Sequence, residues 1–489
     1  MWPAAANGNG NGALDADRIH VTVEVALRPT STADPADVRQ RVARLFSGNL
    51  RYEDGPVDVG QGADPFLAAN VHSVRLVDTD PDVSRKYGGT LLAWQYAAAV
   101  HAYQLSEEGA ADDDEGEDGV PSYREWILPC REFEGLWESL YYDIGIKSRL
   151  LQYASSALLF SEAGVDSNLV AWNRVVLLHG PPGTGKTSLC KALAQKLTIR
   201  LGHRYTTGQL VEVNAHSLFS KWFSESGKLV SKLFSKIGEL VEEEGSLVFV
   251  LIDEVESLTS ARKAAVSGSE PSDAIRAVNA LLTQLDALRS RPNAVVLTTS
   301  NITEAIDLAF VDRADIKAYI GPPSEHARYE VLRTSVQELG RAGILGDLPP
   351  SRRLPAYSDL DLSSRPSPGG GASGGGGGAH AAGDAMATDG GSMGGSMGGS
   401  GSMGGGGSMG GGGGGEGGEA AELRALARML WEAAAAADGF SGRALRKLPF
   451  LAHAAGPGLP APCPTARFLV ALKAAAEKER ADRSELASG

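Results

Sequence analysis

The sequence lacks the features of several protein classes. Its 489 residues include only three cysteines, Cys130, Cys190 and Cys463, which are far apart and odd in number. We therefore expect a reducing compartment, with neither a disulfide framework nor a closed zinc site. No apolar run reaches the roughly 18 residues that span a bilayer, and the first residues have no apolar signal-peptide core. The nucleus or the cytosol is the expected location, without a membrane.

Excess positive charge is also missing. The formal net charge is −14, from 46 Lys and Arg against 60 Asp and Glu. A protein that coats nucleic acid needs a concentrated basic face, so we expect no direct nucleic-acid binding, although a local basic surface remains an alternative. No group of His and Cys residues has the spacing of metal ligands, and no Ser, His and Asp residues can be recognised as a catalytic triad.

What the chain does contain is a phosphate-binding loop. The apolar run 175–178 precedes GPPGTGKT at 180–187, and a helical pattern follows. Glycines let the loop amides turn inward, and the helix dipole faces the phosphates. Lys186 can reach the β and γ phosphates, and Thr187 can place its hydroxyl on Mg²⁺. The alternative is a chance glycine-rich helix entry. The predicted nucleotide-binding residues are Gly180, Pro181, Pro182, Gly183, Thr184, Gly185, Lys186, Thr187 and Ser188.

Two carboxylates follow a buried strand. The run LVFVLI at 247–252 ends in Asp253 and Glu254, and ligands bind at the carboxyl edge of such sheets. We expect Asp253 to hold Mg²⁺ and Glu254 to orient and deprotonate the attacking water. The alternative is an acidic pair at the surface. Phosphate hydrolysis is the one chemistry that the residues indicate.

Three further polar residues are candidates for the same site. Asn301 follows the apolar strand 294–297 and could touch the γ phosphate, or it could be a turn former. Arg313 could enter a neighbouring subunit's site, or it could be a solubilising side chain. Arg443 follows a Ser-Gly helix entry and could contact the phosphates from a small domain, or it could pair at the surface.

Between the two nucleotide motifs lies a segment with adjacent aromatic residues. Lys221, Trp222 and Phe223 stand in a polar setting. Exposed aromatic side chains can grip an extended polypeptide without reading its sequence. Burial in the core is the alternative.

The chain divides at two compositional breaks. An acidic run lies at 106–119, and 28 of the 61 glycines lie between 369 and 418; neither can build a core. Alternating strands and helices between them predict a parallel sheet with helices on both faces. We expect a strand at 20–27, a helix at 34–46, a second strand at 70–80 and helical periodicity over 126–161. The predicted organisation is a disordered start (1–18), an α+β domain (19–105), an acidic linker (106–122), a large ATPase domain (123–322) and a small helical domain (323–489) with a disordered insertion (364–418).

These motifs, in this order, resemble those of an AAA+ ATPase. The sequences around them are similar to the family of pachytene checkpoint protein 2, also called thyroid receptor-interacting protein 13. The blocks that carry the resemblance are 172–201, 217–230, 247–286, 297–324 and 441–454. The glycine tract falls outside the resemblance.

The resemblance implies a hexameric ring that hydrolyses ATP with Mg²⁺ and remodels HORMA-domain proteins. It implies an N-terminal domain that recruits the HORMA protein or a HORMA-type adaptor, a first pore loop at 221–223, a second pore loop at 262–272 and a lid that carries Arg443 as second sensor. It also implies meiotic chromosome control and spindle checkpoint silencing. A general AAA+ unfoldase with another client, or a nucleotide-gated scaffold with little turnover, are the alternatives.

Overall fold

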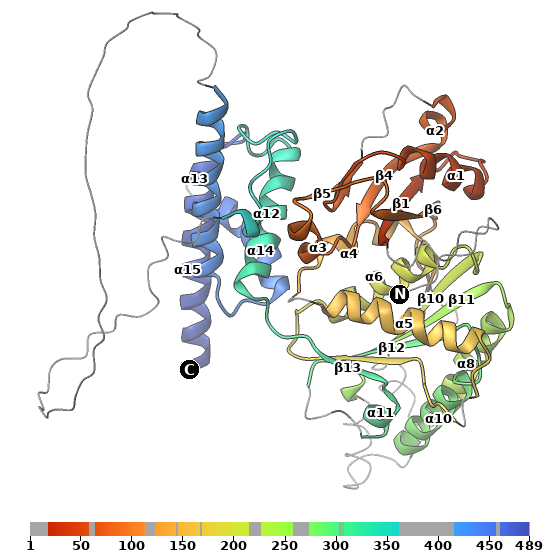
Figure 1. Cartoon of the computed structure of the whole chain (residues 1–489). Coiled ribbons are helices and arrows are strands. Elements are labelled where there is room, and N and C mark those ends of the chain that lie inside the picture. Colours follow the sequence, from red (N-terminus) through yellow and green to blue (C-terminus); the bar gives the residue numbers. More distant parts are fainter. Residues whose placement is uncertain are drawn as a thin grey trace, which may run out of the picture.

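The computed structural model describes most of the chain, and four hydrophobic clusters form its interior. Figure 1 shows the N-terminal domain above the large sheet and the helical lid to one side. The described ranges are 18–57, 64–112, 123–142, 145–166, 169–214, 226–257, 273–302, 306, 308–360, 415–455 and 460–488.

The N-terminal domain is a four-stranded sheet in the order β3-β4-β1-β6. Its central strand β1 runs antiparallel to β4 and parallel to β6. Helix α1 begins after Asp34, whose side chain accepts the Ala36 amide, and it buries Val38 and Val42. The predicted strands and helix of this domain are confirmed. The elements are β1 (Ile19–Leu27), α1 (Pro35–Leu45), β2 (Leu50–Arg51), β3 (Gly55–Pro56), α2 (Pro65–Asn70), β4 (Val71–Val77), α3 (Pro81–Lys86), β5 (Thr90–Leu91) and β6 (Tyr96–Tyr103).

The ATPase domain contains a seven-stranded sheet in the order β13-β9-β12-β11-β10-β8-β7. Its first five strands are parallel, whereas β8 and β7 extend one edge in antiparallel fashion. The strands are β7 (Ala111–Asp112), β8 (Tyr123–Leu128), β9 (Val175–His179), β10 (Thr207–Asn214), β11 (Ser246–Asp253), β12 (Ala294–Ser300) and β13 (Ile316–Tyr319).

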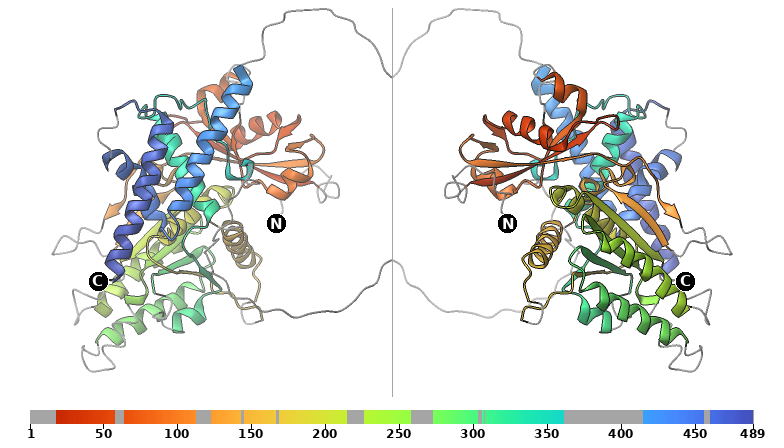
Figure 2. Two further views of the ribbon diagram at one scale, coloured as in Figure 1. Left: turned by 90° about the vertical axis from the view of Figure 1, so that its left-hand side faces the viewer. Right: turned by 90° about the vertical axis from the view of Figure 1, so that its right-hand side faces the viewer.

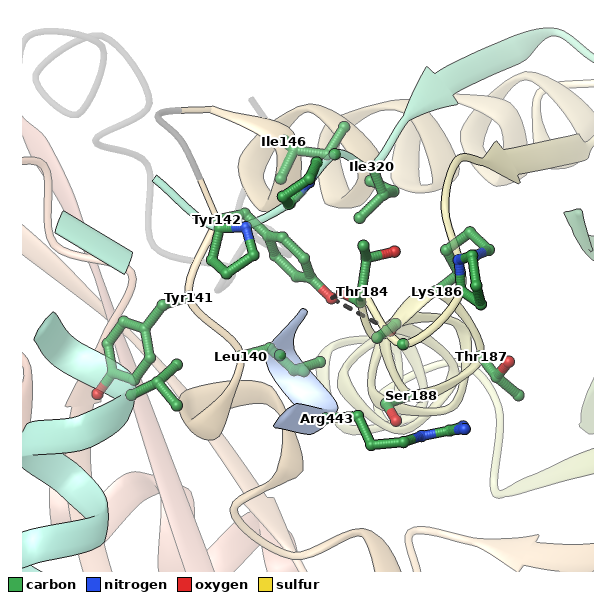
Figure 3. A pocket seen from close by; sticks show the side chains of 18 of the residues that line it. Leu140, Tyr141, Tyr142, Ile146, Thr184, Lys186, Thr187, Ser188, Ile320 and Arg443 are labelled. Carbon is green, nitrogen blue, oxygen red and sulfur yellow. Dashed lines mark hydrogen bonds between the residues drawn. The ribbon is translucent and has the colours of Figure 1, made fainter. Parts of the chain in front are cut away.

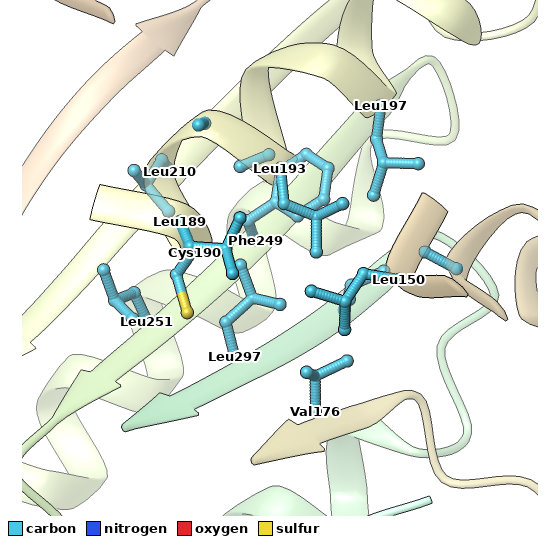
Figure 4. Packing of buried hydrophobic residues seen from close by; sticks show 14 of the residues in the cluster. Leu150, Val176, Leu189, Cys190, Leu193, Leu197, Leu210, Phe249, Leu251 and Leu297 are labelled. Atoms are coloured by element: carbon cyan, nitrogen blue, oxygen red, sulfur yellow. The ribbon is translucent and has the colours of Figure 1, made fainter. Parts of the chain in front are cut away.

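Helices cover both faces of this sheet, as predicted. Residues of β11 alternate between the two cores: Val248 and Val250 face α8 and α10, while Leu247 and Phe249 face α5 and α6. Figure 4 shows the second of these cores, packed between α6 and the sheet. The helices are η1 (Arg131–Phe133), α4 (Leu136–Ser139), α5 (Ile146–Glu162), α6 (Lys186–Arg200), α8 (Ser226–Glu242), α10 (Asp273–Leu288) and α11 (Leu308–Arg313).

The lid is a bundle of four helices around a core of its own. Figure 2 shows its two long helices, α13 and α15, side by side. The predicted helical character of this domain is confirmed. The lid elements are α12 (Glu325–Arg341), η3 (Tyr357–Asp359), α13 (Gly415–Ala436), α14 (Gly442–Ala455) and α15 (Thr465–Ser488). The predicted insertion lies mostly outside the described residues.

Three expectations differ from the structure. The predicted helical periodicity from Trp126 is wrong over its first residues, because 126–128 belong to strand β8. The predicted acidic linker is ordered in its first part: Ser106 bridges to Cys130, and β7 pairs with β8. Pairing with the backbone of an existing sheet edge needs no apolar side chains, so composition did not reveal it. The insertion ends earlier than 418, because α13 begins at Gly415.

Candidate functional site

The phosphate loop joins strand β9 to helix α6, as the sequence predicts. Gly180 has φ +139°, and a Cβ atom there would lie 2.3 Å from the Ile320 carbonyl oxygen. The loop therefore excludes any larger residue at its start, because the neighbouring strand's backbone cannot withdraw. Helix α6 begins at Lys186, so its unpaired first amides face the loop.

Lys186 is buried, and within the described part of the chain its ammonium group hydrogen-bonds to backbone carbonyls and not to a carboxylate. Its side chain is 4% exposed, and its Nζ donates to the Gly180 and Pro181 carbonyl oxygens, each at 2.9 Å. Burial lowers the pKa of Lys186, which the carboxylates of Glu256, Asp253 and Glu254 partly offset. Carbonyl oxygens do not neutralise an ammonium group, so the positive charge of Lys186 remains available to an anion bound in the loop.

The end of strand β11 places Asp253 beside the start of helix α6. The Thr187 hydroxyl donates to Asp253 Oδ1 at 2.9 Å, and the Thr299 hydroxyl of β12 donates to the same oxygen. Thr187 and Asp253 are oxygen groups of the kind that Mg²⁺ prefers, so this pair fits a metal shared with phosphates. The structure brings the two predicted metal residues together.

Glu254 and Asn301 also meet at this edge of the sheet. The side-chain Nδ2 of Asn301 donates to Glu254 Oε1 at 3.1 Å, and the backbone N–H of Asn301 donates to Glu256 Oε1 at 3.0 Å. Glu254 has φ +59°, a conformation that costs about 1–3 kcal/mol in a non-glycine residue. The turn places the Glu254 carboxylate beyond the strand end, where the side-chain amide of Asn301 orients one carboxylate oxygen.

The lid touches the loop directly through the start of helix α14. The Arg443 amide donates to the Gly183 carbonyl oxygen at 3.0 Å, and Arg446 Nη2 donates to the Ser139 carbonyl oxygen at 2.6 Å. A movement of the lid relative to the ATPase domain must therefore break these hydrogen bonds, or the loop and Ser139 must move with the lid.

A cavity of about 890 Å³ connects these groups. The loop, the strand ends with Asp253, Glu254 and Asn301, the segment 139–142 and the start of α14 line it. Figure 3 shows Lys186, Thr187, Ser188 and Arg443 around this space. Its volume lies within the range of small-molecule sites, and its donors suit a triphosphate.

Comparisons with known proteins cover the same three domains. Family models match over residues 16–108 (TRIP13 N-terminal domain), 176–322 (ATPase family associated with various cellular activities, AAA) and 416–480 (TRIP13-like AAA+ ATPase lid C-terminal domain). The chain is 52% identical to a pachytene checkpoint protein 2 homolog of Oryza sativa subsp. indica over 464 residues, 95% of this chain and 88% of that relative. It is 44% identical to the homolog of Homo sapiens, over 96% of this chain and 95% of that relative.

The chain belongs to the pachytene checkpoint protein 2 family. A structure of C. elegans PCH-2 aligns with a TM-score of 0.65 at 29% identity, covering 94% of this chain and 99% of that chain. The predicted AAA+ fold, with its N-terminal domain and lid, is thereby confirmed. The chain is an ATP-hydrolysing AAA+ enzyme.

Other predicted residues lie elsewhere. Arg313 ends helix α11 and is not among the residues that line the cavity of its own chain. Its Nε and Nη2 bind both carboxylate oxygens of Asp286 at 2.8 and 2.7 Å. Both predicted pore loops, 221–223 and 262–272, lie outside the described residues. No helix in the described part of the chain is both long and apolar enough to cross a membrane.

Sequence reasoning missed several residues of the site. Thr299 contacts both acidic residues, since its hydroxyl also accepts the Glu254 amide at 3.3 Å. Its position one residue before a strand end could have revealed it. Tyr142 and Arg446 gave no such signal, because both lie far from the loop in sequence. Only in the folded chain does Tyr142 bind the loop and Arg446 bind Ser139 at the cavity wall.

Proposed function

We propose that the chain assembles into a homohexamer and uses ATP hydrolysis to remodel HORMA-domain proteins by partial unfolding. Its N-terminal domain recruits the HORMA protein or a HORMA-type adaptor. The proposed setting is meiotic recombination and chromosome-axis control, together with spindle checkpoint silencing, on chromosomes in the nucleus and also in the cytoplasm. Membership of the family supports this proposal.

The observation that carries the proposal is the connection between the N-terminal domain and helix α6. Lys196 of α6 binds Glu24 of β1 at 2.6 Å, and both side chains are buried. The same helix begins with the nucleotide-binding Lys186. A recruiting domain fixed to this helix is suited to pass a load between the client and the ATP site.

The residues of the site take the following roles in this proposal. Lys186 binds the phosphates, and Thr187 and Asp253 would hold Mg²⁺, which would supply positive charge to offset that of the phosphates. Glu254, oriented by Asn301, accepts the proton of the attacking water. Arg443 senses the phosphates from the lid, and Arg313 acts on the site of a neighbouring subunit.

The test is an affinity capture with the Glu254→Gln chain. This variant keeps the groups that bind ATP but loses the base, so it should form a stable ATP complex with its client. A HORMA-fold protein captured with ATP, and not with ADP, is the expected result. The matched control is Lys186→Ala with ATP, which should capture nothing in a nucleotide-dependent way.

Other outcomes separate the alternatives. A captured client without a HORMA fold favours a general unfoldase. Wild-type turnover in Glu254→Gln would refute the role of Glu254, and wild-type protein that binds a HORMA client without turnover would indicate a scaffold.

The pore-loop proposal has its own test. Trp222→Ala should bind ATP with near-normal affinity and lose conversion of the client, because the aromatic grip on the polypeptide is removed. Persistent conversion would show that Trp222 does not pull the substrate.

A further inference from the structure

The carbonyl oxygens at the end of the phosphate loop bind a side chain from outside the loop. The Tyr142 hydroxyl lies 3.1 Å from the Gly185 carbonyl oxygen and 3.3 Å from that of Thr184. Because both partners are acceptors, the hydroxyl must donate, and its single hydrogen is shared between them. Figure 3 shows these bonds, with the Tyr142 ring beside the loop.

These two carbonyls determine where two loop amides point. In a trans peptide the C=O and the following N–H point in opposite directions. A carbonyl of Thr184 held toward Tyr142 turns the Gly185 N–H away from it, and a carbonyl of Gly185 held there does the same for the Lys186 N–H. The Gly185 carbonyl also accepts the Leu189 amide at 2.8 Å, so both of its lone pairs are engaged.

The conformational preference of Gly185 does not by itself supply this constraint. Gly185 has φ +90°, and a glycine populates both signs of φ with little preference. A Cβ atom at Gly185 would lie 2.8 Å from the Tyr142 hydroxyl oxygen. Because Gly185 has no side chain, the Tyr142 hydroxyl can approach its backbone. The hydrogen bond then restricts the conformational freedom that a glycine has at this position.

The segment that carries Tyr142 is held in place by the ATPase domain and by the lid. Its ring packs against the core between α6 and the sheet, whereas the preceding Tyr141 packs against the lid core. Ser139 of the same segment accepts the hydrogen bond from Arg446 of the lid. Burial raises the pKa of Tyr142, so the hydroxyl keeps the proton that it donates.

We propose that Tyr142 is a positioning residue of the ATP site: its hydroxyl orients the amides of Gly185 and Lys186 toward the phosphates. The inference rests on the proposed role of residues 180–188 as the phosphate loop, and it does not depend on the identity of the client.

The test replaces only the hydroxyl, in the full-length Tyr142→Phe chain. Competition against a fluorescent ATP analogue should show ATP and ADP binding about 3- to 10-fold more weakly, the effect of one lost hydrogen bond. Adenosine, which has no phosphate, should bind as in the wild type. KM for ATP should rise with kcat little changed, because the bond acts in both the ground state and the transition state.

Two controls make the result decisive. Tyr153→Phe also removes a partly buried hydroxyl that is hydrogen-bonded, to Asp315, from the neighbouring helix α5, and should bind ATP as the wild type does. Lys186→Ala should lose ATP binding. If Lys186→Ala binds ATP normally, the loop assignment fails. If Lys186→Ala loses ATP binding as expected, the result for Tyr142→Phe decides the proposal. The role of Tyr142 is overturned if Tyr142→Phe binds ATP like the wild type, or if its affinity for adenosine falls as much as its affinity for ATP.

Discussion

Helix α6 carries a buried lysine near each end, and the two lysines are held in opposite ways. Lys186 at the start donates to two backbone carbonyls. Lys196, near the other end, binds the carboxylates of Glu24 at 2.6 Å and Glu138 at 2.8 Å. Each lysine is 4% exposed, so burial alone does not distinguish them.

The difference lies in whether the positive charge is already neutralised. Carboxylates compensate Lys196 inside the protein, which makes it a structural link between the N-terminal domain and the ATPase domain. Burial raises the pKa of Glu138, but the charge and hydrogen bond of Lys196, together with the Glu138 backbone amide and Arg75, hold it below its usual value. The charge of Lys186 remains available to phosphate. A buried lysine among neutral acceptors is thus the better indicator of an anion site.

The first prediction breaks the nucleotide end of the helix. Lys186→Ala should lower kcat/KM for ATP roughly 100- to 1000-fold, the usual loss when a preorganised donor to a transition state is removed. The unfolding midpoint should stay near the wild-type value, because water in the cavity can replace the ammonium group at the loop carbonyls. Steady-state ATPase assays and thermal unfolding measure the two effects. Undiminished hydrolysis would contradict the comparison.

The second prediction breaks the structural end. Glu24→Ala should lower the free energy of unfolding by about 3 kcal/mol, because it leaves buried positive charge only partly compensated. Arg200 keeps its contact with Asp78, which limits the loss. ATP affinity of the folded variant should be unchanged. Denaturant unfolding and nucleotide titration provide the measurements.

A double variant sharpens this second result. Glu24→Leu combined with Lys196→Met removes both charges of this pair, so it should recover part of the stability that Glu24→Ala loses. Recovery should be incomplete, because the partly exposed Glu138 also loses its contact with Lys196. If the double variant is as unstable as Glu24→Ala, the ion pair is not the source of the loss.

The third prediction concerns the strand ends beside Lys186. Thr299→Val keeps the shape of the side chain but loses the hydroxyl that binds Asp253 and the Glu254 amide. Since hydrogen bonds to charged groups are worth about 1.5–3 kcal/mol, kcat should fall about tenfold or more. Thr298→Val, at the neighbouring residue whose hydroxyl binds the Val176 carbonyl instead, is the matched control. An equal loss of kcat in both variants would assign the effect to the strand rather than to the acidic pair.

Near neutral pH the smallest effect is expected from His101 of strand β6, at the N-terminal-domain end. Burial lowers the pKa of His101 from its usual 6.5 to about 3, and Arg200 and His203 add to this shift. Below pH 6.5 the unfolded chain gains a proton that the folded chain does not take up until about pH 3, so His101 lowers stability as pH falls across this window.

His101→Gln removes that contribution. Its free energy of unfolding should fall less steeply with decreasing pH than that of the wild type, by at most about 1.4 kcal/mol per pH unit. Unfolding curves at several pH values measure both slopes. Parallel slopes would show that His101 takes up its proton equally in both states.

Much of the ATP site could be predicted because its residues are adjacent in sequence or lie at strand ends. Gly180 to Thr187 form one continuous loop, and the carboxyl ends of parallel strands meet at one edge of a sheet. Asp253 and Asn301 therefore had to lie near the loop once the strands were recognised. Strand β8 was less visible, because it is short and the proline that follows it is also typical of a helix start.

The phosphate loop, the acidic strand end and the family of the chain follow from the amino-acid sequence alone, because covalent connection and short periodicities carry that information. The folded chain was needed to show that Tyr142 binds the loop, that Arg313 pairs with Asp286, and that Glu24 meets Lys196 across 172 residues. Such pairs depend on how separate domains pack. Neither residue type nor spacing specifies which distant side chains share a buried position, since many partners would satisfy the same charge or hydroxyl.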